Sequence, residues 1–174
     1  MARFHAFGSL KMSVALISIG SNLGNSKENV TVAIKALGKL DDCRMLAFSS
    51  FYLTKPWGYK EQPDFINCAC KLETGLDPLS LLHCMQKLEQ DFHRVRNLKY
   101  GPRTLDLDLI AFDDLVMHTK ELTLPHPHLH ERAFVLVPLC QIAGDFVISQ
   151  HNKTVNELCS KLTCEQKNEV KICD

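Results

Sequence analysis

The 174-residue sequence carries no net charge, no long apolar run and no secretory signal. Lysine plus arginine and aspartate plus glutamate each total 20, so no overall positive field draws the chain to DNA or to an anionic membrane. No apolar run approaches the ~18 residues that a membrane helix needs. The first 11 residues lack the apolar core of a secretory signal. Any positively charged binding site must therefore be local.

The eight cysteines never form a C-x-x-C pair. This removes the ligand spacing of zinc ribbons and thioredoxin-like sites. Cys68 and Cys70 lie in an apolar run and have the pattern of core residues in a strand. Scattered thiols suit a reducing compartment, so we expect a cytoplasmic protein. The segment Gly20-Ser-Asn-Leu-Gly24 lacks the Walker lysine, which excludes a P-loop and favours a structural turn.

Length and composition predict a single globular domain. The chain is 45% hydrophobic and 23% charged, as in ordinary folded proteins, and is long enough to bury a core without disulfides. We expect residues 1–12 to be a disordered extension and residues 13–174 to form the domain.

Hydrophobic periodicity predicts the element order β-α-β-β-α-β. Strands are expected at 14–19, 44–53, 65–73 and 104–112, with helices after Asn25 and Pro78. This is the ferredoxin-like order, an α+β class in which both helices lie on one face of an antiparallel sheet. C-terminal additions follow, with short helices expected at 134–143 and 154–162.

Leucines alternate with aspartates in Leu105-Asp-Leu-Asp-Leu-Ile110. On a strand the leucines enter the core, while Asp106 and Asp108 share the opposite face about 6–7 Å apart. Two carboxylates this close repel each other unless a cation lies between them. Oxygen ligands favour Mg²⁺, which takes its remaining ligands from water and phosphates. A solvated strand face with two charges fits the D-x-D spacing equally well.

The surrounding cations favour the metal interpretation. Arg94, Arg96 and Lys99 stand upstream, and Arg103 lies three residues before Asp106. Cations neutralise the charge of phosphoryl oxygens, so this segment predicts a site for a nucleotide polyphosphate. A basic loop by itself would more often be a solvated surface.

Aromatic and histidine side chains suggest further contacts. Phe65 and Asn67 share the second face of the strand at 65–73, a combination that suits a flat heterocycle. The only tryptophan, Trp57, lies on a loop as either a packing anchor or a substrate lid. The cluster His126, His128 and His130 has no cysteine partner, so we favour a single histidine bound to phosphate over zinc.

Six segments occur in an order typical of one enzyme family. They are Gly20-Ser-Asn-Leu-Gly24, Ser50-Phe-Tyr52 with Thr54, Gln62-Pro-Asp-Phe-Ile-Asn67, Arg94-Val-Arg96, Gly101-Pro-Arg-Thr-Leu-Asp-Leu-Asp-Leu109, and Pro125-His126 with Arg132 and Phe134. Together they closely resemble the 6-hydroxymethyl-7,8-dihydropterin pyrophosphokinases of folate biosynthesis. The resemblance implies a ferredoxin-like fold and transfer of the β,γ-pyrophosphoryl group of ATP to the pterin hydroxymethyl group, with release of AMP.

The resemblance also implies roles for individual residues. Asp106 and Asp108 match the ligands of two Mg²⁺ ions, and Arg94 and Arg103 match catalytic cations. Positions lining the ATP site are Gln86, Glu89, Arg94, Arg96, Arg103, Leu109, His126 and Arg132. Positions in the pterin pocket are Thr54, Lys55, Trp57, Phe65, Asn67 and Phe134. The chain departs from the family where Tyr100 replaces a usual tryptophan and Lys55 a frequent proline, and where the loop before Tyr100 is about one residue shorter.

The competing interpretation is a non-catalytic ferredoxin-like module that binds RNA or a regulatory ligand. Such modules bind RNA through exposed aromatics in a basic surround, whereas the expected site face carries Asp106 and Asp108. We therefore expect ATP and the dihydropterin as partners, no nucleic acid or membrane, and a monomer. Loops 54–63 and 93–104 are expected to close over the substrates to exclude water.

Overall fold

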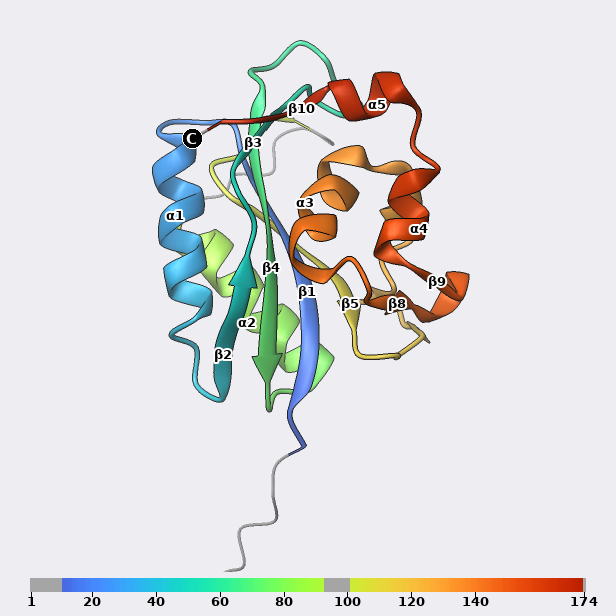
Figure 1. The fold of residues 1–174 in the computed structure, drawn as a ribbon. Coiled ribbons are helices and arrows are strands. Elements are labelled where there is room, and N and C mark those ends of the chain that lie inside the picture. Colours follow the sequence, from blue (N-terminus) through green and yellow to red (C-terminus); the bar gives the residue numbers. More distant parts are fainter. Residues whose placement is uncertain (1–10, 93–100, 174) are drawn as a thin grey trace, which may run out of the picture.

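The computed structural model describes residues 11–92 and 101–173 (Figure 1). In chain order the elements are β1 (Ser13–Ser21), α1 (Ser26–Leu37), β2 (Cys43–Phe48), β3 (Tyr52–Thr54), β4 (Phe65–Thr74), α2 (Pro78–Asp91), β5 (Asp106–Phe112), β6 (Met117–His118), β7 (Thr123–Leu124), the 3-10 turn η1 (Leu129–Glu131), α3 (Ala133–Ala143), β8 (Val147–Ile148), η2 (Ser149–His151), β9 (Lys153–Thr154), α4 (Val155–Ser160), α5 (Cys164–Asn168) and β10 (Val170–Ile172). The expectation of disorder at 1–12 falls almost wholly on residues outside this description.

One antiparallel sheet organises the molecule. The strand order is β10-β3-β4-β1-β5, and β2 pairs with β4 beside β3. Strands β5, β1, β4 and the β2–β3 segment have the order of a ferredoxin-like sheet, which confirms the predicted fold class.

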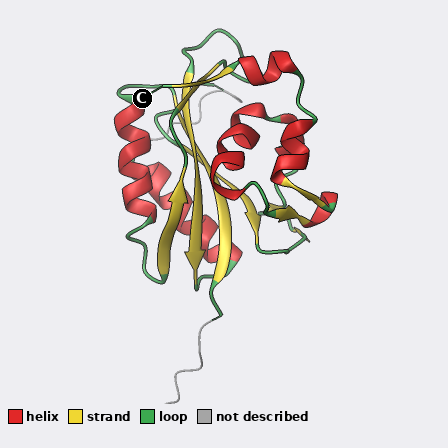
Figure 2. Cartoon of the chain, viewed as in Figure 1, coloured by secondary structure: helices red, strands yellow, loops and turns green. Residues whose placement is uncertain are grey.

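Helices cover both faces of the sheet (Figures 1 and 2). Helices α1 and α2 pack on one face over a core that includes Ile17, Leu72 and Leu107. The C-terminal helices α3 and α4 cover part of the other face, where Leu16, Ala69 and Ile110 meet Leu136. The predicted pair of helices on one face is therefore present, and the C-terminal additions complete the second layer.

The single strand predicted at 44–53 is wrong, because the chain forms two strands separated at Ser49. The Ser49 hydroxyl accepts a hydrogen bond from the Ala69 amide at 2.9 Å. The Ser50 amide turns away from the sheet and donates to Gln141 Oε1 on α3 at 2.8 Å. The Ser49 amide still donates to the Ala69 carbonyl at 2.9 Å. Side-chain bonds thus replace the other bonds of the ladder at Ser49 and Ser50, a competition that periodicity does not reveal.

Strand β5 begins at Asp106 rather than at the predicted Thr104. The Thr104 carbonyl accepts hydrogen bonds from the Ser21 hydroxyl at 2.6 Å and from Asn29 Nδ2 at 3.1 Å. The Thr104 hydroxyl donates to the Phe92 carbonyl at 2.8 Å. These bonds occupy the polar groups of Thr104 and hold the chain just before the two aspartates.

The C-terminal segment contains elements that periodicity did not predict. The helix expected at 154–162 is the shorter α4, and α5 and β10 follow it. Strand β10 adds to the edge of the sheet, with Val170 opposite Thr54 and Ile172 opposite Tyr52. The end of the chain therefore lies against β3. Among the described residues, no helix has both the length and the apolar character required to cross a membrane.

Candidate active site

The sheet register brings Asn67 of β4 and the aspartates of β5 close together on one face of the sheet. Gly20 on the central strand β1 lies opposite Asn67 of β4 on one side and opposite Asp106 of β5 on the other. Two strand spacings of ~4.8 Å put Asn67 and Asp106 about 10 Å apart. A Cβ at position 20 would lie 2.8 Å from Asn67 Oδ1 and 3.6 Å from the Phe65 ring. Glycine thus leaves room for both side chains to lie over the central strand.

The alternation in β5 separates core leucines from site carboxylates as predicted. Leu105, Leu107 and Leu109 are buried in the core on the α1–α2 side. Asp106 pairs with Arg103. Asp108 pairs with Arg132, whose Nη1 lies 3.2 Å from Asp108 Oδ2. Two carboxylates and two guanidinium groups therefore lie on one part of the sheet face.

These carboxylates have the charge and the donor type that Mg²⁺ requires. Burial and the neighbouring Asp106 carboxylate raise the pKa of Asp108 to about 6, although Arg132 and Arg103 act in the opposite direction. The arginines therefore do not offset burial and repulsion together, and an added cation would stabilise the charged form of Asp108. Within residues 11–92 and 101–173, no cluster of three or more acidic, histidine or cysteine side chains could hold a metal. Mg²⁺ takes few ligands from protein carboxylates and completes its shell with phosphates and water, so Asp106 and Asp108 offer the oxygen donors that it prefers.

Arg132 joins the carboxylates to an aromatic pocket. Its guanidinium carbon lies 4.9 Å from the centre of the Trp57 ring and 5.6 Å from that of Phe134. Only 8% of the residue is exposed. Its Nε is buried without a hydrogen-bond partner among the described atoms, which leaves a donor for an anionic ligand.

His126 lies beside this guanidinium as a neutral side chain. Burial and the charge of Arg132 lower the pKa of His126 to about 4. The His128 amide donates to its Nδ1 at 3.2 Å, and Arg132 Nη1 lies 3.4 Å from its Nε2. A neutral imidazole can accept only one of these hydrogen bonds, because its other nitrogen carries the proton. A neutral imidazole next to an arginine suits a phosphoryl oxygen better than zinc.

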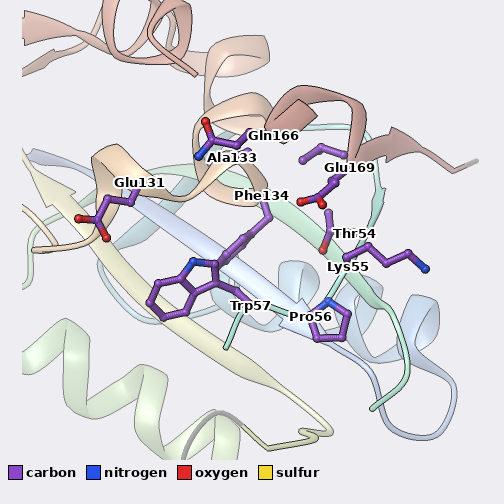
Figure 3. A pocket seen from close by; sticks show the side chains of 10 residues that line it. Thr54, Lys55, Pro56, Trp57, Glu131, Ala133, Phe134, Gln166 and Glu169 are labelled. Carbon is purple, nitrogen blue, oxygen red and sulfur yellow. The ribbon is translucent and has the colours of Figure 1, made fainter. Parts of the chain in front are cut away.

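The aromatic pocket opens between β3, the loop at 55–63, the start of α3 and the C-terminal segment (Figure 3). Its lining consists of Thr54, Lys55, Pro56, Trp57, Glu131, Ala133, Phe134, Gln166, Glu169 and Val170. Asn67 Nδ2 donates to Thr54 Oγ1 at 2.6 Å, which connects Asn67 to this wall. Lys55 pairs with Asp64 at 2.9 Å across the base of the loop. The pocket is thus aromatic on two sides and polar along β3.

Comparison with known proteins decides the family. The model of the 7,8-dihydro-6-hydroxymethylpterin-pyrophosphokinase family matches residues 16–144. The chain belongs to this family. One relative is the 2-amino-4-hydroxy-6-hydroxymethyldihydropteridine pyrophosphokinase of Haemophilus influenzae. It is 41% identical over 147 residues, which are 84% of this chain and 91% of the relative.

Longer relatives contain the pyrophosphokinase sequence as one part. The folic acid synthesis protein fol1 of Schizosaccharomyces pombe is 39% identical over 158 residues, which are 91% of this chain but 22% of fol1. A crystal structure of Plasmodium falciparum HPPK-DHPS with pteroate superposes with a TM-score of 0.76 at 14% identity, covering 94% of this chain and 44% of that chain. At this identity the structural likeness supports the fold alone.

The structure describes most residues that the pyrophosphokinase resemblance assigned to ATP. Arg103, His126 and Arg132 lie with the two aspartates, and Gln86 is half-buried one turn before Glu89 on α2. The Leu109 side chain is in the core, so a contact with ATP would have to come from its backbone. Arg94 and Arg96, like Lys99 and Tyr100, lie outside the described residues.

Glu89 has a structural bond that the sequence did not predict. It is only 4% exposed, and its Oε1 accepts a hydrogen bond from the Leu107 amide at 2.7 Å. Leu107 lies between Asp106 and Asp108, so Glu89 holds the backbone that carries both carboxylates. A direct contact of Glu89 with ATP stays a prediction.

Asn22 is a site residue that the sequence reasoning missed. Its Oδ1 accepts a hydrogen bond from the Arg103 amide at 2.7 Å. Its Nδ2 donates to Gln62 Oε1 and to the Pro63 carbonyl, both at 3.0 Å. One side chain in the glycine turn therefore connects the arginine segment to the loop that carries Trp57. The partners of Asn22 lie 40 or more positions away from it in the sequence. The only signal for this role in the sequence is that Asn22 belongs to one of the six segments shared with the family.

Replacing Asn22 by alanine should lower kcat/KM for the pterin by about 10- to 100-fold. The change removes three hydrogen bonds, each worth about 1 kcal/mol, and frees both segments from each other. Steady-state kinetics and thermal unfolding should be measured together. Asn25→Ala is the matched control, because Asn25 caps α1 in the same turn and has no bond to either segment. Equal kinetics for the two variants would contradict the positioning role.

Proposed function

We propose that this chain transfers the β,γ-pyrophosphoryl group of ATP to the hydroxymethyl group of 6-hydroxymethyl-7,8-dihydropterin, as its family is named to do. The observation that carries this proposal is the row Asn67, Gly20 and Asp106 across the sheet. It puts a side chain suited to a flat heterocycle two strands from a pair of carboxylates suited to a metal–polyphosphate complex.

The described residues form two binding regions, one for the triphosphate and one for the pterin. We assign Arg103 and Arg132 to the triphosphate oxygens, with neutral His126 beside Arg132 as a further hydrogen-bond donor to them. Asn67 contacts the edge of the pterin, while Phe65 and Phe134 hold its ring between aromatic faces. The hydroxymethyl oxygen bonds to the β-phosphorus and releases its proton to solvent. The bond between the β-phosphorus and the α,β-bridging oxygen breaks, and AMP leaves with that oxygen.

Asp106 and Asp108 would hold the metal part of the substrate complex. We assign them two Mg²⁺ ions. When bound, these ions neutralise charge on the phosphates and orient the reacting groups. Arg94 and Arg96 are assigned to the same triphosphate. This arrangement depends mainly on position, because phosphoryl transfer needs aligned oxygens more than covalent help from the protein.

We also assign a role to Trp57 and a cellular compartment to the enzyme. Trp57 stacks on Arg132 at the edge of the pocket, which supports a lid that covers the bound pterin. The eight cysteines are free thiols, which supports a reducing compartment and hence a cytoplasmic location. We also propose that the protein acts as a monomer.

An AMP-release assay tests the proposal. Purified protein with Mg²⁺ and ATP should release AMP only when the dihydropterin is added, and EDTA should stop the release. Dihydropterin without the hydroxymethyl group is the control, because it fills the pocket but offers no acceptor oxygen. Absence of AMP from folded protein with all components, or ADP in its place, would reject the proposed reaction.

A further inference from the structure

The C-terminal segment beyond the family match forms part of the pocket wall. The family model ends at residue 144, yet Gln166 and Glu169 of the segment 164–170 line the pocket with Val170. Pairing of β10 with β3 fixes this position, because Val170 lies opposite Thr54. Helix α5 also contacts α3, whose first turn carries Phe134. The segment is therefore held on two sides against the residues proposed to bind the acceptor.

Glu169 brings a carboxylate to the polar side of this pocket. In Figure 3 its carboxylate points toward the pocket beside Thr54, while Trp57 and Phe134 supply the aromatic side. Thr54 Oγ1 accepts the hydrogen bond from Asn67. Glu169 and Asn67 therefore both lie beside Thr54.

The other charged groups of the pocket already have partners. Glu131 lies 3.3 Å from ring nitrogens of both His128 and His130. Lys55 is paired with Asp64 at 2.9 Å. The Glu169 carboxylate has no hydrogen-bond or ionic partner among residues 11–92 and 101–173. Among the charged side chains that line the pocket, Glu169 therefore offers an acceptor that a ligand can use without breaking one of these pairs.

We propose that Glu169 is a specificity-determining residue that accepts hydrogen bonds from the 2-amino edge of the heterocycle. This inference rests on the proposed function for its choice of ligand. An amino group next to a ring N–H presents two donors, which a carboxylate can accept together. A carbonyl oxygen in place of the amino group would face the carboxylate and be repelled. Glu169 therefore selects amino-substituted rings over their oxo counterparts.

Binding of a matched ligand pair tests this inference without catalysis. The probes are 6-hydroxymethylpterin and 6-hydroxymethyllumazine, which carry an amino and an oxo group at the same ring position. Titrations contain Mg²⁺ and a non-hydrolysable ATP analogue, and quenching of the single tryptophan reports binding. Wild-type protein should bind the amino compound about 100-fold more tightly, and Glu169→Gln should reduce that ratio about tenfold, since a charged hydrogen bond is replaced by a weaker neutral one.

Controls separate specificity from folding and from the proposed reaction. Glu165→Gln changes an exposed glutamate on α5, the helix that Glu169 caps, and Glu165 does not line the pocket. This control should leave the ratio unchanged. Glu169→Asp keeps the charge and should keep most of the preference. In turnover, Glu169→Gln should raise KM for the dihydropterin and leave KM for ATP unchanged.

The outcomes distinguish the two claims. An amino-to-oxo ratio that stays within twofold of wild type in Glu169→Gln would overturn the inference, whatever the activity. Amino-selective binding that depends on Glu169, without AMP release, would support the inference and reject the proposed function. Wild-type protein that binds neither compound would overturn both.

Discussion

Replacing Asp106 by asparagine should lower kcat by about 10³-fold or more while leaving the fold intact. The carboxylate is a hard anionic oxygen ligand, and asparagine keeps its size but not its charge. The side chain lies on the site face and is not part of the core. Its loss therefore removes the proposed metal ligand without opening a cavity.

The measurement is single-turnover formation of AMP at saturating Mg²⁺, with circular dichroism as the check on folding. Asp114→Asn is the matched control, because Asp114 is an exposed aspartate just beyond the end of the same strand. Activity of Asp106→Asn within tenfold of wild type would exclude the metal role of this carboxylate.

Replacing Asp108 by asparagine should abolish turnover and stabilise the metal-free protein by about 1–2 kcal/mol at pH 7.5. The folded-state pKa of Asp108 is about 6, above the ~3.9 of an unfolded chain. Ionisation of this group therefore opposes folding from pH ~4 upward, and the effect is complete above pH ~6. The full two-unit shift would correspond to about 3 kcal/mol, and we discount it because 34% of the side chain is exposed to solvent. Asparagine still offers Arg132 an oxygen.

The pH dependence of this stabilisation provides the control for the Asp108→Asn prediction. The difference between wild type and Asp108→Asn should be greatest above pH 6, shrink as the pH falls from 6 to 4, and vanish below ~4, where the carboxyl is neutral in both states. Thermal unfolding in EDTA across this range measures the effect. A variant less stable than wild type at pH 7.5 would show that Asp108 serves the fold rather than the ligand.

Local patterns predicted the parts of the site that lie on one strand. Alternation placed Asp106 and Asp108 opposite the core leucines, and the same rule separated Phe65 and Asn67 from Cys68 and Cys70. In both strands the buried leucines and cysteines confirm the faces. These predictions succeeded because a strand has a fixed period of two, whatever the rest of the fold does.

Contacts between distant segments could not be predicted in this way. Nothing in the local sequence shows that Gly20 separates Asn67 from Asp106, because register is a property of the assembled sheet. The bonds of Asn22 and Glu89 likewise join segments that meet only after folding. Short polar elements such as α5 and β10 have too few residues to show a period.

The family resemblance alone indicates that a pyrophosphoryl group is transferred. Residue spacing and site geometry are equally compatible with phosphoryl transfer. Two carboxylates and flanking arginines suit any nucleotide polyphosphate. Attack at the γ-phosphorus would give ADP and a pterin monophosphate, whereas attack at the β-phosphorus gives AMP and a pterin diphosphate.

Phosphorus NMR of the complete reaction distinguishes these outcomes most directly. With wild-type protein, Mg²⁺, ATP and the hydroxymethyldihydropterin, we predict equal amounts of AMP and pterin diphosphate, with two coupled phosphorus signals from the latter, and no reaction with Asp106→Asn. ADP with a single phosphomonoester signal, or product formation by Asp106→Asn at the wild-type rate, would contradict the account.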